Sequence, residues 1–217
     1  MKKFAEFEAK KILAAHGIPV TREILAKNAD DAKKAAQKIG YPVAMKVQSH
    51  DILHKTDAGG ILLNLKSADE VAKGYEKIIS NARKYDKSAK IQGVLVQEML
   101  TDGHQCIIGS KKDPQFGPVI MFGLGGIFVE VFKDVAFRII PINREDAKEM
   151  ISGIKGYGVL KGARGQKPVN FRALEDALLK VSGMVWKDKK LDELDINPLF
   201  VSPSGVKAAD ARMIFSD

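Results

Sequence analysis

The sequence predicts an α+β protein of two lobes, and three observations lead to this prediction. Residues 1–95 alternate helical patterns with short apolar strand patterns, residues 96–217 are richer in strands, and no repeat or low-complexity segment interrupts either part. A natural hinge lies at 96–103, where the first sheet is expected to end. We therefore expect two domains, 1–95 with an N-terminal helix and a smaller lobe, and 96–217 with a larger lobe. A cleft between two such lobes is a favoured place for a small ligand.

Helix-stopping and helix-capping residues divide the first part of the chain. A His-Gly pair followed by proline ends a helix expected at 4–15, Gly40 ends one expected from residue 28 or 30, and a Ser-Ala-Asp-Glu capping box opens one expected at 67–85. The apolar runs between these helices are typical of strands. The strands expected here are 20–26, 42–47, 60–65 and 93–99.

The second part is richer in strand patterns. Asn143 caps a helix that Gly153 stops, and Asn170 caps a longer helix that runs to about Trp186. A Ser-Pro-Ser-Gly turn joins the two arms of a hairpin expected at 194–209. The other strands expected in this part are 104–110, 119–122, 129–132 and 136–140.

Composition narrows the class of protein. The chain has 217 residues, a formal net charge of +8 and a single cysteine, Cys106, which cannot form an internal disulfide, so a reducing cytoplasm is the expected location. The basic N-terminus is not followed by the apolar stretch of a signal peptide, and no apolar run is long enough to cross a bilayer. The positive charge raises nucleic acid as a partner, but the lysines are mixed with Asp and Glu, as on solvated helix faces. We therefore expect neither a nucleic-acid nor a membrane partner.

Residues 46–60 carry the groups best suited to handling phosphate. Lys46 ends an apolar strand, where an ammonium group needs a partner such as a phosphate oxygen, although its head can also reach water. The segment 49–60 (SHDILHKTDAGG) combines imidazole, ammonium, hydroxyl, carboxylate and two glycines. Glycines let backbone N–H groups approach an anion, an imidazole can attack phosphorus, and a neighbouring acid can orient it. The alternative is a decorated surface turn, and the glycine–lysine spacing excludes a Walker loop.

Two further stretches invite comparison with nucleotide sites. Gln97-Glu98-Met99 ends a strand at the expected hinge, where its backbone can pair with an adenine edge and its polar side chains with ribose; an ordinary strand end is the alternative. The Gly-Leu-Gly-Gly stretch at 123–126 lacks the spacing and the helix of a dinucleotide fingerprint, so we reject a Rossmann fold. A loop that approaches phosphate and a tight structural turn are equally good interpretations of it.

Two oxygen-bearing side chains are expected to meet in the C-terminal hairpin. A short hairpin brings its arms side by side, so that Asn197 and Asp210 can face each other. Amide and carboxylate oxygens suit Mg²⁺, which keeps several waters and takes further ligands from substrate phosphates. Arg138 and Arg212 can each neutralise charge on a transferring phosphoryl group. The alternatives are an Asn-Pro turn, a solvated carboxylate and surface arginines.

The order of these motifs resembles a known family. The resemblance rests on Lys46, His-Lys-Thr-Asp-x-Gly-Gly at 54–60, Gln97-Glu98-Met99, Asp-Pro-x-Phe-Gly-Pro at 113–118, Gly-Leu-Gly-Gly at 123–126 and Asp-Ile-Asn-Pro at 195–198. In this order they resemble the β subunit of ADP-forming acyl-CoA synthetases over nearly the whole chain. Similarity to succinyl-CoA synthetase β subunits is more distant.

This resemblance implies an ATP-grasp fold and the reaction acyl-CoA + ADP + phosphate ⇌ acid + CoA + ATP. In such enzymes a separate subunit or domain binds CoA and carries a first phosphorylated histidine. His54 would then be the second histidine, which relays the phosphoryl group to the nucleotide. Lys46 would hold nucleotide phosphate, residues 96–99 adenine, and Asn197 with Asp210 the Mg²⁺ ion. The implied partner is a CoA-binding α subunit in a heterotetramer, without which the chain lacks full activity.

The candidate site residues fall into three groups. The catalytic candidates are His54, Asp57 and Arg138. The candidates for binding ATP or ADP are Lys46, Ser49, Lys55, Thr56, Gly59, Gly60, Val96, Gln97, Glu98, Met99 and Gln105. The metal candidates are Asn197 and Asp210.

One position departs from the family pattern, and two other functions fit the same fold. Gln105 stands before Gly109 where members of the family usually have Glu in a Glu-x-x-x-Gly pattern, which leaves the preference for ADP or GDP open. A carboxylate–amine ligase of the ATP-grasp type would transfer phosphate directly to its substrate and would not need His54. A regulatory module like those fused to protein acetyltransferases would bind nucleotide without turnover.

Overall fold

The chain folds into two compact units whose bounds differ from the expected domains. The computed structural model describes residues 2–52, 54–126, 129, 131–162 and 165–216. One unit is Thr21–Thr101, called here the smaller unit; the larger unit joins Met1–Val20 with Asp102–Asp217. The prediction had placed residues 1–20 in the smaller lobe. They belong to the larger unit because Lys2–Phe4 pairs with the C-terminal strand and Val20 forms a β-bridge with Ala208.

The smaller unit is an antiparallel sheet with helices on one face. Its strands lie in the order β2-β5-β3-β4 among the described residues. Their bounds are β2 (Glu23–Ala26), β3 (Val43–Ser49), β4 (Ile61–Leu65) and β5 (Ile91–Glu98), and the helices are α2 (Ala29–Ile39) and α3 (Ala68–Tyr85). The predicted caps are confirmed: Asn28 accepts from the N–H of Asp31, and Ser67 accepts from the N–H of Glu70.

Alternation along the central strand β3 separates two kinds of side chain. Val43, Met45 and Val47 belong to the apolar cluster that includes the buried residues of α2 and α3. The residues between them therefore lie on the opposite face, because successive side chains of a strand alternate. Lys46 and Gln48 are both on this second face and both buried. Since Gln97 of β5 pairs with Ala44, it shares this face, and we call Lys46, Gln48 and Gln97 the polar face of the smaller sheet.

The larger unit is built around a longer antiparallel sheet. Its described strands follow the order β1-β11-β9-β6-β7-β8, with β10 also paired to β9. The strands are β1 (Lys2–Phe4), β6 (His104–Asp113), β7 (Gly117–Leu124), β8 (Val135–Ile139), β9 (Leu191–Ser202), β10 (Gly205–Ala208) and β11 (Ala211–Phe215). The helices are α1 (Glu6–Ala15), α5 (Arg144–Ser152), α6 (Tyr157–Leu160) and α7 (Phe171–Lys187).

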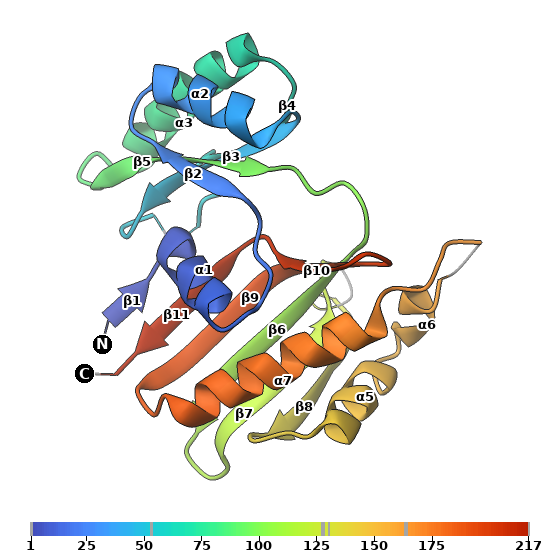
Figure 1. The fold of residues 1–217 in the computed structure, drawn as a ribbon. Helices are drawn as coiled ribbons and strands as arrows, with labels where there is room; N and C mark the ends of the chain where they lie inside the picture. The colour runs from blue at the N-terminus through green and yellow to red at the C-terminus, as the bar shows by residue number, and fades with distance from the viewer. Residues whose placement is uncertain (1, 53, 127–128, 130, 163–164, 217) are drawn as a thin grey trace. The chain divides into compact units, whose positions relative to one another are not determined.

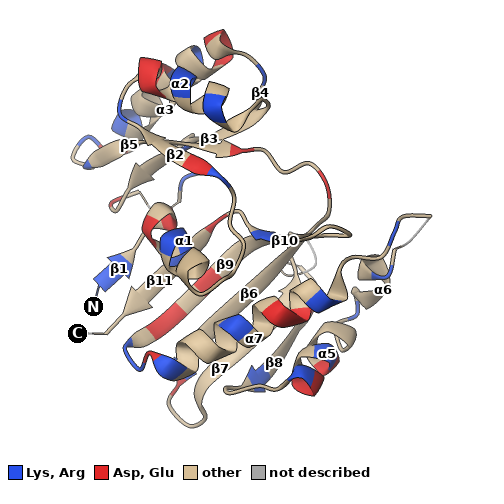
Figure 2. Cartoon of the chain, viewed as in Figure 1, with Lys and Arg blue, Asp and Glu red and all other residues tan. Residues whose placement is uncertain are grey.

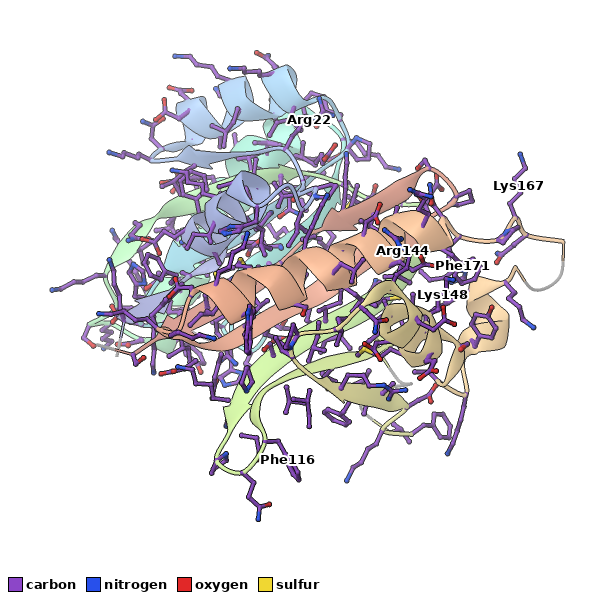
Figure 3. The ribbon with its side chains drawn as sticks, turned by 60° about the horizontal axis from the view of Figure 1, so that its bottom comes forward. Arg22, Phe116, Arg144, Lys148, Lys167 and Phe171 are labelled. Carbon is purple, nitrogen blue, oxygen red and sulfur yellow. The ribbon has the colours of Figure 1, made fainter. Side chains whose placement is uncertain are left out.

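Helices α5 and α7 cover one face of this sheet (Figure 1). Ile108, Ile120 and Phe122 are fully buried and belong to the same apolar cluster as Leu178 and Val181 of α7. Arg144 at the start of α5, labelled in Figure 3, forms ion pairs with Glu175 and Asp176 of α7. These contacts hold the two helices together above the apolar face, which we call the covered face.

The remaining differences from the predicted elements lie mainly at strand ends. Strands β1 and β11 were not predicted, and the helix expected at 4–15 begins at Glu6 because Lys2–Phe4 is a strand. The strand expected at 129–132 is wrong: Val129 is helical, residues 131–132 form a turn, and residue 130 lies outside the described residues.

Charge and hydropathy agree with the expectations from composition. Lysine and arginine alternate with aspartate and glutamate on the helices of each unit (Figure 2), as expected of solvated helix faces. Within the described part of the chain, no helix has both the length and the apolar character needed to span a membrane.

The core of the larger unit predicts a large stability difference between two phenylalanines. Phe122 is fully buried, whereas Phe116 is 59% exposed at the tip of the β6–β7 turn (Figure 3). We expect Phe122→Ala to lower the free energy of unfolding by about 3–5 kcal/mol, since it removes buried area and leaves a cavity. Phe116→Ala should change it by less than about 0.5 kcal/mol. Chemical denaturation of both variants measures the difference, and equal effects would contradict the assigned core.

Candidate functional site

The predicted phosphate segment of the smaller unit contains a tightly hydrogen-bonded loop. The N–H of Ala58 donates to the carbonyl of His54 at 3.1 Å, that of Gly59 to Thr56 at 2.9 Å, and that of Gly60 to Lys55 at 2.8 Å. We call residues 54–60 the His54 loop. The side chains of His54, Thr56 and Asp57 are exposed and that of Lys55 is half-buried. The imidazole therefore lies on an accessible loop and not in a packed core.

The two glycines of this loop are required by its packing. Gly59 has a φ of +57°, which favours glycine, and its carbonyl accepts a hydrogen bond from Asn81 Nδ2 of α3 at 3.0 Å. A Cβ at Gly60 would lie 2.5 Å from Cγ1 of Val47, so a side chain cannot be accommodated there without movement of β3 or the loop. The structure thus gives both glycines a role in shaping the loop, and their predicted contact with phosphate remains a prediction.

Ser49 also has a structural role at the start of the segment. Its hydroxyl donates to the carbonyl of Lys90 at 3.0 Å and accepts from the N–H of Asp51 at 3.1 Å. Asp51 in turn accepts from the N–H of Lys90 at 2.7 Å. These hydrogen bonds join the end of β3 to the residue before β5. The hydroxyl of Ser49 therefore has a structural role, and its contact with the nucleotide stays a prediction.

The strand-end residues predicted to hold adenine differ in where they point. Val96 packs into the apolar cluster under α2 and α3, and Glu98 binds Arg22 through both the backbone N–H and Nε, at 2.9 and 3.1 Å. The N–H of Met99 donates to the carbonyl of Pro42 at 3.3 Å. Gln97, in contrast, lies on the polar face with Lys46, and both side chains are buried. Sequence reasoning missed Gln48 on this face, because the expected strand ended at residue 47, whereas β3 continues to Ser49.

The predicted metal residues of the larger unit are adjacent. The N–H of Asn197 donates to the carbonyl of Asp210 at 3.2 Å, and that of Ala209 to Pro198 at 2.9 Å, so the two arms are paired across the gap between β10 and β11. Ile196 and Ala211, the next pair, are buried in the core. Asn197 and Asp210 therefore lie on the face opposite the helices, which we call the open face.

A β-bulge adjoins this pair on the other side of β9. The register between β6 and β9 shifts between Cys106 and Ile108, where Asn197-Pro198 adds a residue to β9. Bulges often redirect side chains at functional sites. The described residues hold no group of three or more His, Cys, Asp and Glu side chains suited to a metal. An amide and a carboxylate fit Mg²⁺, which completes its shell with waters and phosphate oxygens.

The two arginines considered for charge neutralisation lie on opposite faces of the sheet. Arg212 lies opposite Asp195 in the strand register on the open face, and each is two residues along the chain from Asp210 and Asn197, respectively. Burial raises the pKa of the Asp195 carboxyl, and the nearby Arg212 opposes that rise. Arg138 pairs with Ile120 and its guanidinium binds Glu149 of α5 at 2.9 Å. The structure therefore does not support a catalytic role for Arg138, because its side chain lies on the covered face.

The open face also contains a cavity that sequence reasoning did not predict. Its volume is about 520 Å³ and its lining combines apolar and charged side chains. Among the lining residues are Lys111, Met121, Phe137, Glu193, Asp195 and Arg212.

Gln105, the departure from the family pattern, has an exposed side chain on β6. Its carbonyl accepts from the N–H of Gly125 at 2.7 Å, and a Cβ at Gly125 would lie 3.1 Å from that oxygen. Gly125 of the Gly-Leu-Gly-Gly stretch is therefore closely packed against the backbone of β6.

Comparisons with known proteins identify the family of this chain. A model of the ATP-grasp domain matches residues 1–215. The β subunit of acetate–CoA ligase (ADP-forming) II from Pyrococcus furiosus is 54% identical over 212 residues, covering 96% of this chain and 90% of that protein. The 4-hydroxybutyrate–CoA ligase (ADP-forming) of Nitrosopumilus maritimus is 47% identical over 200 residues, which are 92% of this chain and 29% of that protein.

Solved structures show the same fold. The dinucleotide-forming acetyl-coenzyme A synthetase 1 of Ca. Korarchaeum cryptofilum, in complex with coenzyme A and Ca-AMPCP, superposes with a TM-score of 0.96 at 44% identity, covering 99% of this chain and 94% of that one. A second structure of that enzyme holds Mg-AMPPCP, with a phosphohistidine segment that points towards the nucleotide-binding site; its TM-score is 0.87 at 41% identity, over 99% and 93% of the two chains. The chain therefore belongs to the ATP-grasp family and, within it, to the β subunits of ADP-forming acetate–CoA ligases.

Proposed function

We propose that this chain is the nucleotide-binding subunit of an ADP-forming acyl-CoA synthetase, which interconverts acyl-CoA, ADP and phosphate with acid, CoA and ATP. The observation that carries the proposal is an exposed histidine, His54, on a hydrogen-bonded loop next to strand β3, which carries the buried Lys46. The chain is also 54% identical to an acetate–CoA ligase β subunit. A polar face with Lys46 and an Asn–Asp pair support nucleotide binding.

His54 relays the phosphoryl group in this proposal. A ring nitrogen attacks the phosphorus of a phosphohistidine on the partner, so that the partner's P–N bond breaks as the new P–N bond forms. A terminal oxygen of ADP then attacks the same phosphorus, and His54 leaves as free imidazole when ATP forms. Such transfers depend mainly on positioning and on stabilisation of charge. The exposed ring supplies access, and the fixed backbone of its loop supplies positioning.

Other residues supply charge and ligands. Lys46 neutralises nucleotide phosphate, and Asp57, exposed on the same loop, orients the imidazole. Asn197 and Asp210 would hold Mg²⁺, which supplies positive charge to the nucleotide phosphates. Arg212, which lies opposite Asp195 on the open face, neutralises charge on the transferring phosphoryl group.

A partner completes the reaction. The Pyrococcus furiosus relatives are named as β subunits, whereas the Nitrosopumilus maritimus ligase is a single chain of which this sequence matches 29%. We infer that a separate CoA-binding α subunit supplies what the rest of such a chain contains, in a heterotetramer of two subunits of each kind. The acid substrate is expected to be recognised largely on that partner.

Replacing His54 tests the relay. With His54→Asn we expect no acid-labile, base-stable phosphate on this chain after incubation of the reconstituted enzyme with labelled ATP and Mg²⁺. We also expect turnover to fall by about a thousandfold or more, as when other covalent nucleophiles are removed. His50→Asn, in the same segment, is the matched control and should keep both signals. Full turnover by His54→Asn would favour a ligase that phosphorylates its substrate directly.

Replacing Asp210 tests the metal pair. Asp210→Asn removes the negative charge of the pair, and we expect the Mg²⁺ concentration for half-maximal nucleotide binding to rise about tenfold or more. Calorimetric titration of ADP at a series of Mg²⁺ concentrations measures this shift. Asp69→Asn, an exposed carboxylate in the first turn of α3, is the control. An unchanged Mg²⁺ dependence would remove Asp210 from the proposed site.

Replacing Asn81 tests the anchoring of the His54 loop. Asn81→Ala deletes the hydrogen bond to the Gly59 carbonyl, which should cost about 1 kcal/mol and increase hydrogen exchange at the amides of Ala58, Gly59 and Gly60. Lys73→Ala, an exposed position nearer the start of the same helix, should leave those amides unchanged. If the two variants exchange alike, α3 does not anchor the loop.

A further inference from the structure

Gln48 contains a buried acceptor that the described residues leave unsatisfied. The residue is 2% exposed, and Oε1 has no hydrogen-bond partner among the residues that the structure describes. Such an atom costs about 1–3 kcal/mol in desolvation, and buried polar groups in native proteins are rarely left in this state. A donor for such an acceptor comes either from a buried water or from a bound ligand.

The position of Gln48 favours a bound ligand. On the polar face, Gln48 is the next side chain of strand β3 after Lys46, the proposed phosphate-binding residue. Its cross-strand neighbour on β5 is Gly93, which has no side chain that could donate to the amide. On the other edge of β3, the N–H of Val47 donates to the carbonyl of Gly60 at 2.8 Å, so the glycines of the His54 loop adjoin the same place. Gln48 thus lies where the phosphate-binding strand meets the loop that carries the histidine.

We propose that Gln48 is a further nucleotide-binding residue, whose Oε1 accepts a hydrogen bond from the bound nucleoside diphosphate or triphosphate. This inference rests on the proposed function, because it requires a nucleotide at the polar face. Ionised phosphate oxygens have no proton to donate. Beside Lys46, the proposed phosphate-binding residue, the donors that accompany the phosphates are a ribose hydroxyl and a water held by the nucleotide's magnesium ion.

A purely structural glutamine would behave differently from a ligand-binding one. Methionine has nearly the length of glutamine and no amide, so Gln48→Met removes the unsatisfied acceptor and keeps most of the volume. If Oε1 serves the ligand, the protein without ligand should be as stable as the wild type or more stable, while nucleotide affinity falls. If Gln48 serves the fold, stability falls and affinity does not.

The test measures ADP binding and thermal unfolding of the purified chain. For Gln48→Met we expect the Kd for ADP with Mg²⁺ to rise about tenfold, as for the loss of one buried hydrogen bond, with a Tm equal to or above that of the wild type. Gln92→Met, an exposed glutamine on β5, is the matched control and should change neither value. An unchanged Kd, or a lower Tm without a change in Kd, overturns the proposal.

Two further titrations identify the donor. A ribose hydroxyl predicts that the affinity loss persists in EDTA and disappears with 2′,3′-dideoxy-ADP, whereas a magnesium-bound water predicts that the loss disappears in EDTA. In the wild-type protein, the side-chain amide ¹⁵N resonance of Gln48 should shift on addition of ADP, and a resonance that does not move would overturn the proposal even if Gln48→Met fails to fold.

Wild-type chain that binds no ADP would refute the proposed function itself, whereas equal binding by wild type and Gln48→Met refutes this inference alone.

Discussion

The arrangement of the smaller unit depends on the register of strand β3, which is paired on both edges and buried along its whole length. One face of the strand packs Val43, Met45 and Val47 against the helices, and the other presents Lys46 and Gln48. A slip of one residue would exchange the two faces and place an ammonium group in the apolar core. The pairing with β5 therefore fixes both the core and the polar face with one set of backbone hydrogen bonds.

The His54 loop combines a fixed backbone with accessible side chains. Its internal hydrogen bonds and the bond from Asn81 fix the path of the chain, and Gly60 lets that path pass close to Val47. The side chain of His54 remains exposed. A residue that accepts and releases a phosphoryl group needs both properties, because positioning lowers the barrier and exposure admits the donor and the acceptor in turn.

In the larger unit, the two faces of the sheet carry different kinds of side chain. The covered face carries the apolar cluster beneath α5 and α7, and Arg138 lies there as a partner of Glu149. The open face carries Asn197, Asp210 and the Asp195–Arg212 pair. Strand β9, which supplies Asn197, also supplies core residues such as Ile196, so this open-face side chain stands on a rigid support.

The sequence by itself determined the features that depend on near neighbours in the chain. Caps at Asn28, Ser67, Asn143 and Asn170, the turn after Ser202 and most strands follow from local hydrogen bonding and side-chain periodicity. The hairpin that joins Asn197 to Asp210 was predictable for the same reason, since a short turn aligns its two arms. The order of motifs also indicated the family.

Only the tertiary structure decided the features that depend on distant contacts. The pairing of β1 with β11 moved the N-terminal residues into the larger unit, and the pairing of Arg138 with Ile120 placed that arginine on the covered face. Glu98 and Ser49 gained structural partners, Arg22 and Lys90, which are far from them in the chain, and their nucleotide contacts remain predictions. The unsatisfied acceptor of Gln48 likewise follows from its neighbour across the sheet, Gly93. A local pattern shows that a side chain is polar, but its partner and the face it occupies are set by strands that meet only when the whole chain has folded.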